Sequence, residues 1–195
     1  MMAARAAFAW RIVGVRCAGP PGRPPARGRA LRGESMQADR QPAAAMQVGH
    51  ALIMLAELPD HSADAAYPIA VRVACLESFF SNLRLMFEFL IDKPKGRQRI
   101  HRRDYLRGWD PPAGPAVEAL RRQYGFASEQ MSHLARSRVL ADGGPITTVS
   151  LPDMKWLAVL TLDVTRQFAD ALDAAGHPSA QTFRGYVDDA RARIQ

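Results

Sequence analysis

The most regular pattern of apolar and polar positions in this chain runs from Cys75 to Leu90, where one polar stripe interrupts an otherwise apolar segment. The polar side chains recur at intervals of three or four residues, which places them on one side of a helix. They are Glu77, Ser81, Arg84 and Glu88, and apolar side chains cover most of the remaining surface. A helix with so large an apolar surface is typical of the centre of a helical bundle.

Helical spacing continues on both sides of this segment. It predicts a short helix from Met46 to Leu58, a long helix over about 66–92, a single turn near 103–106, and further helical segments at 116–123, 127–140, 151–175 and 179–193. The clearest helix start is a capping box of Ser150 and Asp153. Residues 146–151 are a candidate for a short extended piece, and no longer stretch alternates as a strand does. We therefore predict an all-α fold, a compact bundle of five or six helices.

Composition divides the 195 residues into two parts. Residues 1–45 hold eight arginines and two acidic residues, so the net charge of +7 arises mainly there, and residues 46–195 are nearly neutral. The charge therefore does not by itself indicate a polyanionic partner. We expect 1–45 to be a disordered Arg/Pro-rich leader and 46–195 to be the helical domain. A transit-like segment and a translation start at Met36 or Met46 are the other interpretations of the leader.

The cysteines and histidines bear on the cellular location of the protein and on whether it binds a metal. The two cysteines, Cys17 and Cys75, are too few for a disulfide framework, which favours a reducing, cytoplasmic location. No uninterrupted apolar run approaches the roughly 18–20 residues that span a bilayer, so no membrane segment is expected. A Glu129/His133 pair lacks further ligands at metal-binding spacing, and phosphate-binding glycine motifs are absent, so we expect no metal and no cofactor.

The polar stripe has three interpretations. It is a solvated face with an i, i+4 pair of Arg84 and Glu88, or Arg84 points into the bundle and joins a buried network. In a third interpretation, Arg84 and His133 have a catalytic role. The buried network would comprise Glu77, Ser81, Arg84, Glu88, His133 and Arg138.

A basic, Pro/Gly-rich connection follows the central helix at residues 93–115, and long connections of this kind are often functional. Arginines interleaved with aromatic side chains can bind phosphates and stack on bases. Candidate nucleic-acid contacts are Arg97, Arg99, Arg102, Arg103, Tyr105 and Arg107. In the alternative interpretation, Tyr105 and Trp109 fold inward, anchor the connection on the bundle and leave the arginines solvated.

The motif order LESFF with LRLMFEFL, then RRDYLRGW, then SEQMSHLARSR, then a Trp-bearing long helix resembles a family of small bacterial all-helical proteins of unknown function. The resemblance covers about residues 46–175, and it implies motif positions at Glu77, Ser78, Phe79, Arg84, Phe89, Tyr105, Trp109, His133 and Arg138. The chain departs from the family at two positions: Asn82 stands where the family usually has His, and Leu85 where it usually has Asn. The chain is also similar to HEPN domains, helical bundles that include RNA-cleaving toxins, although their Arg-to-His signature is absent.

These observations predict a non-enzymatic binding or interaction protein, with a homodimer or another protein as partner. The alternative is a HEPN-like RNA-binding or RNA-cleaving protein of a defence or toxin–antitoxin type, which would use Arg84, His133 and the basic connection. The two predictions differ in salt dependence, because phosphate contacts weaken as salt rises.

Overall fold

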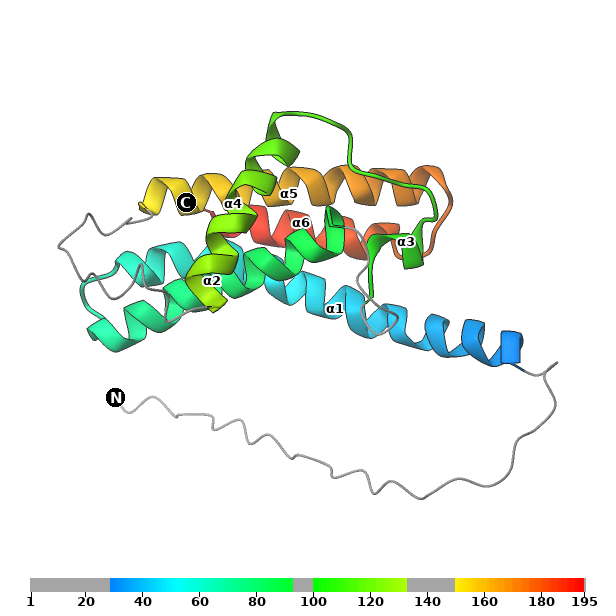
Figure 1. Ribbon diagram of the computed structural model, residues 1–195, viewed down its shortest axis with the longest axis horizontal. Helices are drawn as coiled ribbons and strands as arrows, with labels where there is room; N and C mark the ends of the chain where they lie inside the picture. Colours follow the sequence, from blue (N-terminus) through cyan, green and yellow to red (C-terminus); the bar gives the residue numbers. More distant parts are fainter. Residues whose placement is uncertain (1–28, 93–99, 133–149, 195) are drawn as a thin grey trace, which may run out of the picture.

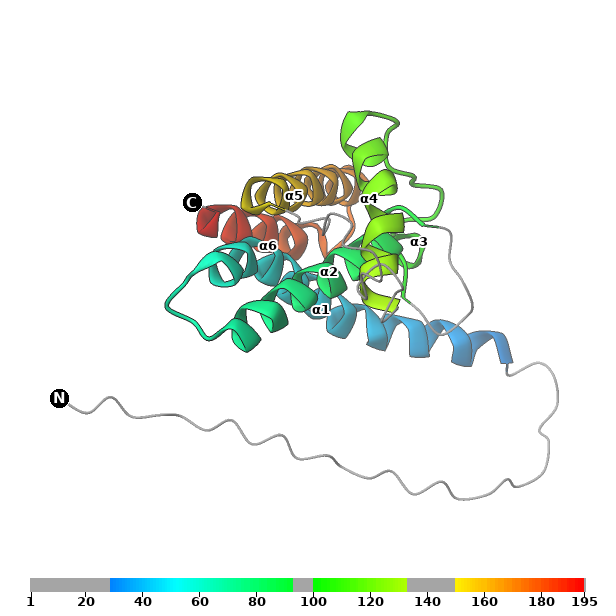
Figure 2. The same ribbon diagram turned by 60° about the vertical axis from the view of Figure 1, so that its left-hand side comes forward.

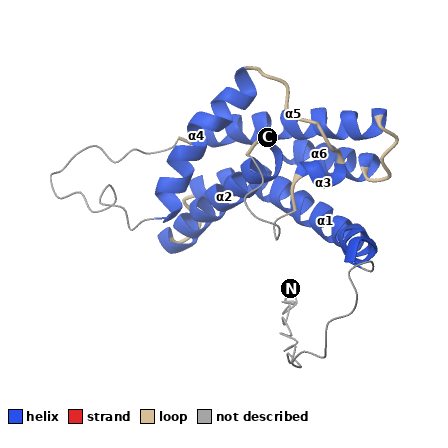
Figure 3. Ribbon diagram, turned by 45° about the vertical axis from the view of Figure 1, so that its right-hand side comes forward, coloured by secondary structure: helices blue, strands red, loops and turns tan. Residues whose placement is uncertain are grey.

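The computed structural model describes residues 29–92, 100–132 and 150–194, and for 29–39 and 126–132 it describes the backbone alone. These residues form six helices and no strand (Figures 1 and 3). The helices are α1 Arg29–Ala63, α2 Ile69–Leu90, α3 Arg102–Tyr105, α4 Pro115–Ser132, α5 Leu151–Ala174 and α6 Ala180–Arg193. The prediction of an all-α bundle of five or six helices is confirmed.

Two helical hairpins make up the body of the bundle. α1 packs along α2, α5 packs along α6, and the second hairpin lies against α1 (Figure 1). α4 crosses both α2 and α5. α3 is a single turn at one end of the bundle, and the connection between α1 and α2 lies at the other end (Figures 1 and 2). The two ends are therefore built from different elements.

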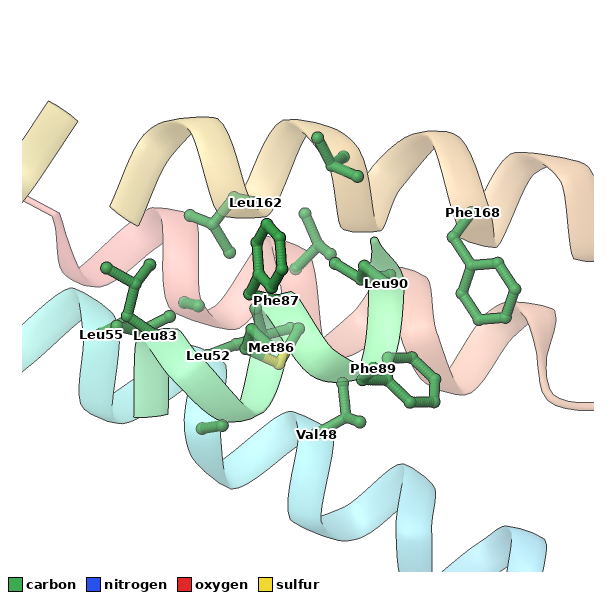
Figure 4. Close-up of a cluster of buried hydrophobic side chains, with 14 of the residues drawn as sticks. Val48, Leu52, Leu55, Leu83, Met86, Phe87, Phe89, Leu90, Leu162 and Phe168 are labelled. Carbon is green, nitrogen blue, oxygen red and sulfur yellow. The ribbon is translucent and has the colours of Figure 1, made fainter. Parts of the chain in front are cut away.

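The hydrophobic core lies between the two hairpins (Figure 4). Its largest fully buried apolar side chains come from four helices and include Leu52, Leu55, Phe79, Met86, Leu90, Leu157, Leu162, Phe168 and Phe183. Moving one such side chain out of water stabilises the fold by roughly 1.5–3 kcal/mol. This burial explains why the apolar central segment of the sequence becomes the middle of the bundle.

The N-terminal boundary of the helical domain differs from the prediction. α1 begins at Arg29, and Ala44 and Ala45 are buried in the core. The predicted boundary at 45/46 is therefore wrong. Pro42 lies inside α1, where a proline removes one backbone hydrogen bond and normally disfavours a helix. Packing of the residues that follow Pro42 offsets this cost. The first 28 residues of the predicted leader lie outside the described residues.

Most other helix boundaries agree with the sequence pattern. α2, α3 and α6 begin and end close to the predicted positions, and Ser150 and Asp153 make both hydrogen bonds of the capping box at the start of α5. α1 continues past Leu58 to Ala63 and includes Pro59. α4 runs through Gly125, where a break was predicted, because one glycine costs a helix only about 1 kcal/mol. The helical residues predicted after Ser132 lie outside the described residues, and so do residues 146–149 of the extended piece predicted at 146–151, whereas Leu151 is the first residue of α5.

Candidate functional site

The polar stripe of α2 lies at the surface of the bundle. Nε of Arg84 donates to Oε1 of Glu88 at 3.0 Å, and the hydroxyl of Tyr124 in α4 donates to the same oxygen at 3.3 Å. The hydrogen bond to Glu88 raises the pKa of Arg84, which keeps the guanidinium charged. The Arg84 side chain nevertheless remains 38% exposed.

The prediction of a buried network is corrected by these positions. Ser81 is exposed, and Glu77 and Arg84 are half-buried. Tyr124 of α4 lies over the Arg84–Glu88 part of the stripe, and the described members form a partly solvated face with an i, i+4 pair. His133 and Arg138, the other predicted members, lie outside the described residues, and so does the pairing of Arg84 with His133 that a catalytic role would need.

The basic connection does not present all of its predicted nucleic-acid contacts to solvent. The Arg102 side chain is only 2% exposed and Tyr105 is buried, so the prediction that these two residues contact nucleic acid is wrong. Arg103 and Arg107 are exposed, and Arg103 pairs with Asp110 at 3.0 Å. Arg97 and Arg99 lie outside the described residues.

The aromatic side chains of the connection anchor it on the bundle, as the alternative interpretation predicted. The ring of Tyr105 lies 5.3 Å from that of Phe183 in α6, and the ring of Trp109 lies 4.9 Å from that of Phe168 in α5. The Tyr105 hydroxyl donates to the carbonyl oxygen of Gln41 at 2.5 Å. The amide of Gln41 donates in return to the carbonyl oxygen of Asp104 at 2.7 Å. The turn of α3 is therefore tied to α1, α5 and α6.

Arg102 is the buried polar centre of this turn. Its Nη1 donates to the carbonyl oxygen of Asp92 at 2.9 Å, its Nε donates to the carbonyl oxygen of Trp109 at 3.2 Å, and its Nη2 donates to the carboxylate of Asp110. A buried guanidinium is tolerated only when its donors are paired in this way. Arg102 therefore joins the end of α2 to the residues on both sides of α3.

His101 caps α3 and lies against Arg102. Its backbone N–H donates to the Asp104 carboxylate at 2.7 Å, while its Nδ1 accepts from the backbone N–H of Arg103 at 3.2 Å. Nε2 lies 2.6 Å from the carbonyl oxygen of Asp92. We assign the neutral tautomer with its proton on Nε2, because only that tautomer satisfies both ring nitrogens. Burial lowers the pKa of His101, and the charges of Arg102 and Arg103 act in the same direction.

The opposite end of the bundle exposes large apolar side chains at the start of α2. Ile69 is 71% exposed and Val73 is 45% exposed, and Tyr67, Ala70, Val71 and Ala74 are also exposed. The one charged residue of this segment is Arg72, whose Nε donates to the carbonyl oxygen of Ser62 at 2.9 Å. We call residues 66–74 the apolar start of α2; Figure 2 shows this segment beside the α1–α2 connection.

Many basic side chains on α5 and α6 are paired within the chain. Arg184 contacts Asp170 at 2.8 Å and Asp173 at 3.0 Å, and Arg191 contacts Asp163 at 2.5 Å. Arg193 bridges to Glu57 in α1 and to Asp189. These pairs explain why an arginine-rich sequence leaves this face without a strong excess of positive charge.

Sequence reasoning missed the importance of His101 and Arg102. The spacing of His101 and Asp104 matches a capping box with an unusual N-cap residue, and that signal was available in the sequence. Nothing local distinguishes Arg102 from Arg103, however, because one is buried and the other exposed only through the placement of α3 on the bundle.

No family model matches this chain, and the comparisons with curated proteins and with solved structures found no significant match. Within the part of the chain that the structure describes, no group of three or more His, Cys, Asp or Glu side chains is arranged to hold a metal ion. The helices of the same residues include none that is long and apolar enough to cross a membrane.

Proposed function

We propose that this protein is a non-enzymatic interaction protein that forms a homodimer through the apolar start of α2. The observation that carries the proposal is the exposure of Ile69 and Val73 on a helical segment that is apolar on nearly all sides. A helix of this composition is normally buried in its functional state. Contiguous exposed apolar surface of this kind is typical of a protein interface.

The chemistry of this surface favours a second copy of the chain over other occupants. Apart from Arg72, whose guanidinium already binds the main chain at Ser62, the segment offers no charge that a partner would have to match. An uncharged apolar surface is complementary to itself, and a twofold axis allows the same patch to serve both subunits. Homodimer interfaces are also more apolar than the average protein surface.

RNA binding has less support among the described residues. Arg102 and Tyr105 are buried, and the exposed Arg103 is paired with Asp110. The apolar start of α2 has no group that would contact phosphate, since the guanidinium of Arg72 is turned to Ser62. The resemblance to HEPN-like helical proteins remains a prediction.

The test is the mass of the full chain in solution, measured by sedimentation over a wide range of protein concentration. We expect a reversible monomer–dimer equilibrium that Val73→Glu shifts strongly towards the monomer, because the substitution places a charge in the interface. Met46→Glu is the matched control, because Met46 is also a large exposed apolar residue, 63% exposed, but lies on α1 outside this surface. It should leave the equilibrium unchanged.

A monomer at every concentration would overturn self-association, and so would equal dimerisation of the Val73→Glu and Met46→Glu variants. The same samples are mixed with labelled RNA at low and moderate salt. Salt-sensitive binding of RNA, together with a monomeric mass, would favour the alternative function instead.

A further inference from the structure

The turn around α3 covers an aromatic part of the core. Tyr105 and Trp109 pack on Phe89, Phe168 and Phe183, and the ring of Tyr105 lies 6.0 Å from that of Phe89. These contacts place residues 101–110, which we call the latch, across the end of the bundle formed by α2, α5 and α6. Movement of the latch away from the bundle would therefore expose aromatic surface.

Three sets of polar contacts hold the latch in place. Gln41 binds Tyr105 and the backbone of Asp104, and Arg102 binds the carbonyl oxygens of Asp92 and Trp109. The third set is the cap of α3, in which the imidazole of His101 accepts from the backbone N–H of Arg103. Of these groups, the imidazole is the one whose ordinary pKa, about 6.5, lies near neutrality.

The surroundings of His101 cannot accommodate a second ring proton without change. Nδ1 is already an acceptor for the N–H of Arg103, so a proton there would set two donors against each other. On the other side of the ring, Nη1 of Arg102 lies 2.8 Å from Nε2, and both nitrogens point to the carbonyl oxygen of Asp92. The imidazolium would therefore form beside a buried guanidinium.

The other charged groups near this ring do not remove the conflict. Asp104 accepts from the backbone N–H of His101, and the carboxylate of Asp110 binds Arg102 and Arg103. Asp92 meets the ring through its carbonyl oxygen. His177, in the connection between α5 and α6, has its ring 5.8 Å from that of Tyr105, and burial lowers the pKa of His177 as well. Both histidines are therefore harder to protonate while the latch is closed than a solvated histidine is.

We propose that residues 101–110 form an acid-released latch, in which a proton on Nδ1 of His101 breaks the cap of α3 and lets Tyr105 and Trp109 leave the core. The open latch exposes the aromatic side chains of Phe89, Phe168 and Phe183, a surface distinct from the apolar start of α2. Acid thereby controls a second hydrophobic surface at the opposite end of the bundle.

The sign of the pH dependence follows from the lowered pKa of His101. In the open latch the ring titrates near 6.5, and in the closed latch it titrates at lower pH, so the open form binds the extra proton first. The opening constant should rise by up to about tenfold for each pH unit below 6.5, until the pH reaches the pKa of the closed form. Above pH 6.5 the opening constant should not depend on the protonation of His101.

Hydrogen exchange of the full-length chain, corrected for the intrinsic effect of pH on exchange rates, measures this opening directly. We expect peptides covering 101–110 to lose protection in mild acid while far-UV circular dichroism stays constant. His101→Asn keeps a neutral N-cap acceptor and should strongly reduce the acid response. His50→Asn changes an exposed histidine on α1 and should leave the response unchanged.

An equal acid response in His101→Asn would overturn the latch, and so would loss of the whole helical signal at the same pH. A nuclear magnetic resonance titration of the His101 ring in the unaltered chain keeps the test valid if the variant does not fold. Its midpoint must coincide with the loss of protection at 101–110; a ring that titrates while the latch stays protected would contradict the proposal.

Discussion

Gly49 of α1 lies directly against the ring of Tyr186 in α6: a Cβ atom at position 49 would be 2.6 Å from Cδ1 and 2.7 Å from Cγ of that ring. Real Cβ atoms do not approach other carbon atoms so closely, and Cγ cannot move far because it is attached next to the backbone. The absence of a side chain at Gly49 therefore sets how closely α1 and α6 pack.

Gly49→Ala should lower the free energy of unfolding by about 1–3 kcal/mol, because the ring or the helix must move to admit the methyl group. Chemical denaturation of the variant and of the unaltered chain measures the difference. Gly185→Ala is the control, since nothing lies within 4 Å of a Cβ at that position in α6. It should stabilise the protein by roughly 0.5–1 kcal/mol through helix propensity. Equal effects of the two substitutions would contradict the close contact.

Ser150→Ala should cost about 1 kcal/mol of stability, because it removes the hydroxyl that accepts from the backbone N–H of Asp153 and so caps α5. Ser179→Ala is a matched control: Ser179 occupies the N-cap position of α6, but its side chain makes no capping hydrogen bond. Thermal unfolding should therefore separate the two variants, with a lower midpoint for Ser150→Ala alone. A similar loss from both would show that the capping bond is not the cause.

Ser150 and the start of α1 show which features of the fold the sequence could predict and which it could not. The capping box of Ser150 depends on residues three positions apart, so its local pattern was sufficient. The extent of α1 was not predictable in the same way, because Pro42 disfavours a helix locally while the burial of Ala44 and Ala45 depends on α1 packing against distant elements. Local propensity was outweighed there by tertiary contacts.

The candidate site was predictable only in part for the same reason. The spacing of Tyr105 and Trp109 was compatible both with base stacking and with anchoring, and only the position of α5 and α6 decides between the two. Arg102 and Arg103 are adjacent and chemically identical, yet the first is buried among carbonyl oxygens and the second faces solvent. Such differences arise from the placement of α3 and leave no signature in composition or charge.

Ionisation of the Tyr105 phenol should make the protein less stable in strong alkali. Burial raises the pKa of Tyr105 to about 12 from 10.0, so the unfolded chain releases the phenol proton first. The stabilisation is complete below pH 10.0, falls as the pH rises towards about 12, and amounts to at most about 3 kcal/mol. Tyr105→Phe should remove this part of the alkaline loss while costing about 0.5–1.5 kcal/mol at neutral pH through the lost bond to Gln41. Chemical denaturation of both chains at neutral and at strongly alkaline pH measures the two effects. Parallel profiles of stability against pH for Tyr105→Phe and the unaltered chain would contradict a raised pKa of Tyr105.

Arg102→Met should destabilise the protein by about 1–3 kcal/mol for each buried carbonyl oxygen that loses its guanidinium donor, at Asp92 and Trp109, whereas the exposed carboxylate of Asp110 is solvated by water. Arg103→Met removes an adjacent arginine of the same charge that lies in solvent, and should cost much less. Denaturant titration measures the free energy of unfolding of both variants. Because both substitutions change the net charge equally, the difference between them reports the effect of burying Arg102. If Arg102→Met lowered the free energy of unfolding no more than Arg103→Met does, the hydrogen bonds of Arg102 would not be holding the end of α2 to the turn of α3.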